Sequence, residues 1–137
     1  MIDAHTMLTV LSSLMAHRDK IQAALDQQRG EGFTFQDVFD TVKSERAFFF
    51  WNEDSCAVIE IRRFPGEINI HVFLGAGTTV GLLKLYEHVS EWGARLGATK
   101  MTTLCRKGFK RRLAKHGWKE PQAWLVKEIE HRKESVQ

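Results

Sequence analysis

Glycine and threonine residues are concentrated between Gly75 and Gly81, where the sequence reads Gly-Ala-Gly-Thr-Thr-Val-Gly. An alternating apolar segment precedes this stretch and a helical apolar pattern follows it, so we expect a loop at a helix N-terminus. Free backbone N–H groups and the positive end of the helix dipole favour a phosphate there. The hydroxyls of Thr78 and Thr79 are expected to assist. A plain glycine-rich turn between a strand and a helix is the alternative interpretation.

Glu60 and His71 form a second candidate site. Both lie in predicted strands that flank the Pro65-Gly66 turn, and counting back from that turn places them opposite each other. A histidine held by a carboxylate can act as a base near pH 7. A polar cross-strand pair that only stabilises the sheet is the alternative.

A third candidate is a basic segment near the end of the chain. Seven positive side chains occur there with no acid among them: Arg106, Lys107, Lys110, Arg111, Arg112, Lys115 and Lys119. The whole chain has 20 Lys and Arg against 17 Asp and Glu, so the remainder is net acidic. Three interpretations stay open: a solvated helix face, a contact to a cofactor phosphate, or a contact to DNA or an acidic protein. No motif for sequence-specific nucleic-acid recognition is present.

Composition excludes several classes of protein. The 137 residues and 43% hydrophobic content suit one folded domain, and no apolar run is long enough to span a membrane. The N-terminus does not resemble a signal peptide. Cys56 and Cys105 lack the spacing of metal ligands or of a redox pair, so we expect no metal site and a cytoplasmic location.

The elements that must position these residues follow from apolar periodicity and turn signals. Helices are predicted at 3–28, at 35–42 after an N-cap at Thr34, at 82–96 and at 107–116; strands are predicted at 48–51, 56–64, 67–74, 100–105 and 123–129. The N-terminal helices would occupy 1–45, a sheet with two crossover helices 46–129, and a tail 130–137. The fold class is therefore α/β (α+β), one domain with a mixed β-sheet flanked by helices.

From Ile68 to Ile129 the chain resembles the GNAT superfamily, the GCN5-related N-acetyltransferases. The resemblance is carried by Val80-Gly81-Leu82-Leu83, by residues 92–98 and by residues 113–118. It implies a GNAT-like fold and acetyl-CoA as the cofactor, with its pyrophosphate on the loop before the helix. The implied cofactor-binding residues are Val72, Leu74, Ala76, Gly77, Thr78, Thr79, Val80 and Gly81. Ala76 and Thr79 stand where the family's loop has Gln or Arg and a central Gly.

The resemblance also bears on catalysis. Four residues before Gly117, where the family often has a Tyr that protonates the leaving thiolate, this chain has Leu113. Glu60 or His71 would deprotonate the acceptor amine. Tyr86 lies on the apolar face of a predicted helix, so we expect it in the core.

Two functions follow from these observations. In the first, the chain is a divergent GNAT-like domain with little or no catalytic activity that acts as a structural or interaction protein. Small GNAT-like virion and assembly proteins of tailed bacteriophages are similar in length and loop, which implies protein partners, contact with DNA or another polyanion through Arg106–Lys115, and a location in the host cytoplasm or virion. In the alternative, it is an acetyl-CoA-dependent N-acetyltransferase acting on a small amine or a protein amino group. A degenerate domain would need no cofactor, so the sequence leaves open whether the chain is an enzyme.

Overall fold

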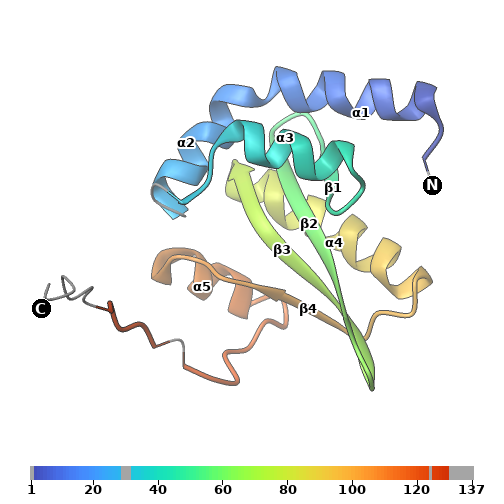
Figure 1. The fold of residues 1–137 in the computed structure, drawn as a ribbon. Helices are drawn as coiled ribbons and strands as arrows, with labels where there is room; N and C mark the ends of the chain where they lie inside the picture. Colours follow the sequence, from blue (N-terminus) through green and yellow to red (C-terminus); the bar gives the residue numbers. More distant parts are fainter. Residues whose placement is uncertain (1, 29–31, 124, 130–137) are drawn as a thin grey trace, which may run out of the picture.

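The computed structural model describes residues 2–28, 32–123 and 125–129 (Figure 1). The elements are α1 (Ala4–Ala16), α2 (Arg18–Gln28), α3 (Phe35–Lys43), β1 (Phe48–Trp51), β2 (Ser55–Phe64), β3 (Glu67–Gly77), α4 (Thr79–Arg95), β4 (Lys100–Thr103) and α5 (Lys107–Ala114). The tail predicted after residue 130 lies outside the described residues.

The N-terminal segment forms two helices where a single one was predicted. α1 ends at His17, whose backbone N–H donates to both Ser13 and Leu14 carbonyls and whose Nδ1 lies 2.8 Å from the Ser13 carbonyl oxygen. The His17 ring also packs edge-on against Phe49 of β1. Apolar periodicity continues through this residue, so the break results from local hydrogen bonds and a long-range contact that the pattern does not report.

The second predicted helix is confirmed as α3, including its N-terminal cap. Thr34 accepts a hydrogen bond from the Asp37 backbone N–H, and the Asp37 carboxylate accepts one from the Thr34 backbone N–H. This reciprocal capping box satisfies two donors that the first turn of a helix leaves free.

The four strands form one mixed sheet in the order β1-β2-β3-β4. β1, β2 and β3 are antiparallel, whereas β3 and β4 are parallel and joined through α4, as the predicted crossover requires. The hairpin register is confirmed, with Phe64 opposite Glu67 and Glu60 opposite His71. The register shifts between Val58 and Ile59, so that Val58 faces Leu74 whereas Ile59 faces Val72.

β3 is longer than predicted, and the loop after it is correspondingly short. Gly75 to Gly77 were expected to break the strand, but they pair with Ala57 to Ser55 of β2 and stay extended. The turn is therefore confined to Thr78, the N-cap of α4. The pairing of β2 decides this boundary, since glycine alone is a weak signal for where a strand ends.

The predicted strand at 123–129 is wrong for the residues of that segment that the structure describes. Residues 123 and 125–129 have no strand pairing, and Leu125 and Ile129 are 89% and 81% exposed. An apolar run becomes a strand only where a neighbour takes up its backbone groups. Trp124 lies outside the described residues.

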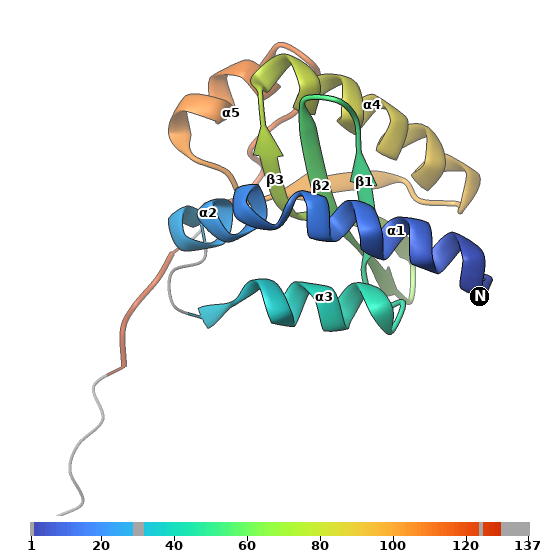
Figure 2. The ribbon, with the colours of Figure 1, turned by 90° about the horizontal axis from the view of Figure 1, so that it is seen from above.

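Helices cover both faces of the sheet (Figure 2). One core joins α1, α2 and α3 to one face and includes Leu14, Leu25, Val38 and Val58. The other joins α4 and α5 to the opposite face and includes Ile59, Leu85, Val89 and Leu113. No helix among the described residues is long and apolar enough to cross a membrane.

Candidate functional site

β4 is much shorter than its neighbour β3. The pairing begins with Asn69 opposite Lys100 and ends with Val72 opposite Thr103. β4 ends there, whereas β3 continues to Gly77. The register shift between Val58 and Ile59 of β2 lies beside this end of the pairing, and such a bulge bends a strand. The upper part of β3 therefore has an edge with no neighbouring strand in the described part of the chain.

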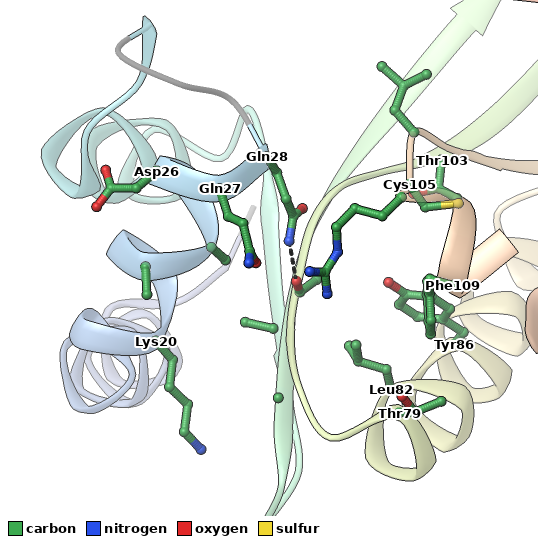
Figure 3. Close-up of a pocket in the computed structure, with 17 residues that line it drawn as sticks. Lys20, Asp26, Gln27, Gln28, Thr79, Leu82, Tyr86, Thr103, Cys105 and Phe109 are labelled. Atoms are coloured by element: carbon green, nitrogen blue, oxygen red, sulfur yellow. Dashed lines mark hydrogen bonds between the residues drawn. The ribbon is translucent and has the colours of Figure 1, made fainter.

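A cavity of about 620 Å³ occupies this opening (Figure 3). Its walls come from α2 on one side of the sheet and from α4 and α5 on the other. The lining includes Lys20 and Gln28 of α2, Gly75 and Gly77 of β3, Thr79 and Tyr86 of α4, and Thr103, Cys105, Arg106 and Phe109. The cavity thus passes between the strands from one helical layer to the other.

The backbone of β3 faces this cavity at Gly75. The Gly75 carbonyl accepts a hydrogen bond from Gln28 Nε2 at 3.1 Å, so a side chain of α2 takes the place that a neighbouring strand would have (Figure 3). An extended ligand could pair with such an open edge, because unpaired strand edges bind extended chains through backbone hydrogen bonds.

The N-terminus of α4 lies at the end of this edge. Thr78 Oγ1 accepts from the Gly81 N–H at 3.0 Å, and Leu82 N–H donates to the Thr78 carbonyl. The N–H groups of Thr79 and Val80 have no partner within the described residues. These two donors and the helix dipole favour an anion, and Thr79 lines the cavity.

Asn52 holds this helix start in place, a role that the sequence analysis missed. Its Oδ1 accepts from the Ser55 N–H and hydroxyl at 2.8 and 2.7 Å, and its Nδ2 donates to the Gly81 carbonyl at 3.0 Å. A Cβ at Gly81 would lie 2.9 to 3.0 Å from Thr78, Asp54 and Ser55. The Asn-x-x-Ser turn signal was visible in the sequence, but its contact with α4 was not.

The residues expected to bind the cofactor occupy three kinds of environment. Ala76, Gly77 and Thr79 line the cavity. Val72 and Leu74 are buried in the two opposite cores. Thr78 and Gly81 form the helix cap, and Val80 is exposed to solvent. The cavity wall therefore includes only part of the predicted loop.

Tyr86 stands at the cavity wall as well as in the core. Its side chain is 5% exposed and packs with Phe109 and Trp118. The hydroxyl is so close to Gly75 that a Cβ added there would collide with it. Burial, followed by Cys105 and Cys56, raises the pKa of Tyr86 well above its usual value. The apolar pattern of the helix predicted only the core role of Tyr86.

Glu60 and His71 are opposite each other, and each also contacts a further residue. His71 Nδ1 lies 2.8 Å from Thr102 Oγ1, and Glu60 Oε1 accepts from Arg62 at 3.4 Å. His71 is 4% exposed and sits one residue before the point where β3 and β4 separate. Their catalytic role stays a prediction.

The basic segment borders the cavity at one residue in particular. Arg106, the N-cap residue of α5, lines it, whereas Lys107, Arg111, Arg112 and Lys115 are exposed and lie away from it. Lys110 forms an ion pair with Glu120 at 2.9 Å.

No group of three or more His, Cys, Asp or Glu side chains within the described residues could hold a metal ion.

Comparison with solved structures defines the fold. No protein-family model and no curated protein matches the sequence. A probable acetyltransferase of known structure is similar over 91% of this chain and 96% of its own, with a TM-score of 0.70 at 7% identity. Glucosamine-6-phosphate N-acetyltransferase from Arabidopsis thaliana matches 85% of this chain and 94% of its own, with a TM-score of 0.62 at 15% identity.

An aminoglycoside acetyltransferase from an uncultured soil metagenomic sample, solved with sisomicin, covers 91% of each chain with a TM-score of 0.63 at 9% identity. The chain therefore has the GNAT-like α/β fold, with a four-stranded mixed sheet flanked by helices in a single domain. This confirms the fold class predicted from the sequence.

Proposed function

We propose that this protein binds an acyl-coenzyme A in the cavity between α2, β3 and α4 and transfers the acyl group to an amine. One observation carries the proposal: the cavity has an unpaired strand edge along it and a helix N-terminus with free N–H groups at its end. The long amide-containing arm of coenzyme A matches the strand edge. Its phosphate groups match the helix N-terminus. The GNAT-like fold supports the same ligand class.

The residues present fit such a ligand. Thr79 and Val80 N–H groups at the start of α4 would hold a phosphate, and Lys20 and Arg106 line the cavity with positive charge. The β3 edge at Gly75 would receive the arm, with Gln28 released from the Gly75 carbonyl. Acyl-coenzyme A supplies the acyl group in activated form, as a thioester.

The base that deprotonates the acceptor amine would be a side chain of β3 or of its neighbour β2. His71 lies where the strands begin to separate, and its contact with Thr102 fixes the orientation of the ring. Glu60, across the hairpin, is partly exposed and held by Arg62. The acceptor would be a small amine or a protein amino group.

The test compares binding with turnover. Acetyl-CoA is titrated into the protein by calorimetry, and acetyl transfer to a panel of amines is followed by release of the CoA thiol. Binding with transfer that falls in His71→Ala or Glu60→Gln supports the proposal. Binding without transfer to any amine would favour the non-catalytic alternative, a structural or assembly protein of the phage type. No binding at millimolar acetyl-CoA would overturn both the cofactor and the enzyme.

A substitution that adds a negative charge tests where the phosphate of the ligand binds. Thr79→Glu places a carboxylate beside the proposed phosphate, so we expect about tenfold or more loss of acetyl-CoA affinity. The same acid at a helix N-terminus favours the dipole, so the melting temperature should not fall. Ser90→Glu is the matched control, since Ser90 is exposed on the same helix, about 16 Å farther along. Equal affinities in the two variants would contradict the site.

A further inference from the structure

Tyr86 is the single tyrosine of the chain, and its hydroxyl is the feature of the cavity that the fold leaves unexplained. The side chain is only 5% exposed and its hydroxyl is open to the cavity, yet no hydrogen bond joins that hydroxyl to the described residues. Buried polar groups in folded proteins are nearly always hydrogen-bonded. A phenol with no protein partner at a cavity wall therefore points to a partner that enters the cavity.

The position of the hydroxyl indicates which part of a bound ligand it would contact. It lies against Gly75, on the unpaired edge of β3, and beside the side chains of Phe109 and Cys105. Figure 3 shows it pointing from α4 toward β3. Tyr86 follows Thr79 by two turns of helix, about 10 Å along the axis from the proposed phosphate site. A group bound near Gly75 is thus distinct from one bound at the helix N-terminus.

We propose that the Tyr86 hydroxyl donates a hydrogen bond to the pantetheine–thioester arm of the bound acyl-coenzyme A. The proposal rests on the function proposed above and assigns this residue a contact within it. The arm offers amide carbonyl oxygens and a thioester as acceptors, and Phe109 and Leu82 give it an apolar wall. A phenol is protonated at neutral pH and burial raises its pKa further, so the hydroxyl is available as a donor.

A single labelled tyrosine makes the contact directly observable. Protein carrying ¹³Cζ-tyrosine gives one resonance, which reports hydrogen bonding at the hydroxyl. It is titrated with acetyl-CoA and, as the matched control, with adenosine 3′,5′-bisphosphate, which has the nucleotide end of the cofactor and no arm. Calorimetry on the same samples establishes that each ligand binds. We expect acetyl-CoA to shift the resonance and the bisphosphate to leave it in place.

A hydroxyl deletion provides a second measurement. Tyr86→Phe removes the donor and keeps the ring, so the contacts with Phe109 and Trp118 persist. Affinity for acetyl-CoA should fall about fivefold, the usual effect of one lost hydrogen bond, while affinity for the bisphosphate stays unchanged.

The outcomes separate the two proposals. If acetyl-CoA binds but neither shifts the resonance nor discriminates between wild type and Tyr86→Phe, the role of Tyr86 is overturned and the proposed function stands. An equal shift with the bisphosphate would also overturn it, because the arm would not be the cause. If neither ligand binds, the proposed function fails, and the role of Tyr86 fails with it.

Discussion

The buried thiol of Cys56 shows how strongly one environment can alter a residue. Cys56 is 1% exposed and belongs to the core beneath α1, α2 and α3. Burial raises the pKa of its thiol to about 11, only partly offset by Lys20. Cys105 is exposed at the cavity, and burial raises its pKa as well. The two cysteines of this chain therefore differ in their access to solvent.

The raised pKa of Cys56 predicts a loss of stability at alkaline pH. Between pH 9 and 11 the unfolded chain releases the thiol proton while the folded chain keeps it, so stability is full below about pH 9 and falls as pH rises toward 11. The loss from this group should reach about 3 kcal/mol. Urea unfolding at several pH values measures it. Cys56→Ala, though less stable, should show a flatter decline; an identical decline would contradict the assignment.

At the scale of elements, the junction of β3 and α4 is held by several close backbone contacts. Gly77 has a φ of +117°, and a Cβ there would collide with the Asp54 carbonyl and with Ser55. The Thr78 N–H donates to that same Asp54 carbonyl at 3.1 Å. The β1–β2 turn therefore fixes both the end of the strand and the start of the helix that the proposed phosphate site needs.

Gly77→Ala should consequently destabilise the protein. The strained backbone and the collision with Asp54 together predict a loss of at least about 1–3 kcal/mol of the free energy of unfolding. Gly66→Ala is the control, since nothing lies near its Cβ position and its φ is not positive, and it should cost less than about 0.5 kcal/mol. Urea denaturation distinguishes them; equal losses would show that the junction is not constrained as described.

At the scale of the whole molecule, one sheet carries two cores. Alternate residues of β2 and β3 enter opposite cores, so that Val58 packs under α2 and α3 while Ile59 packs under α4. The cavity lies where β3 continues beyond the end of β4, and its walls come from both helical layers. Any opening of the sheet thus disturbs both cores and the cavity together.

A shared sheet predicts a single unfolding transition. Leu25→Ala in one core and Leu85→Ala in the other should each cost about 2–5 kcal/mol. In both variants, unfolding followed by circular dichroism and by tryptophan fluorescence should coincide, because neither core persists without the strands. Leu8→Ala, on an exposed face of α1, should change little. Separate transitions for the two probes would contradict this coupling.

Local signals predicted the elements that depend on neighbouring residues. The Pro65-Gly66 turn and the alternation of Ile68, Ile70 and Val72 determined the hairpin register, which the structure confirms. Thr34 and Asp37 identified the start of α3. The break at His17 and the missing strand at 125–129 were not predictable in this way. They depend on contacts with distant segments, which apolar periodicity does not contain.

The sequence by itself determined the α/β class, the parallel pairing of two strands joined through a helix, and the glycine-rich segment before α4. Only the tertiary structure decided where the candidate cavity lies. The cavity lies beside the part of β3 that extends beyond the end of β4, next to a register shift between β2 and β3, and both features depend on the pairing of distant strands. Likewise, the apolar face of a helix marks Tyr86 as buried, but only packing against Gly75 and Phe109 decides that its hydroxyl reaches a cavity.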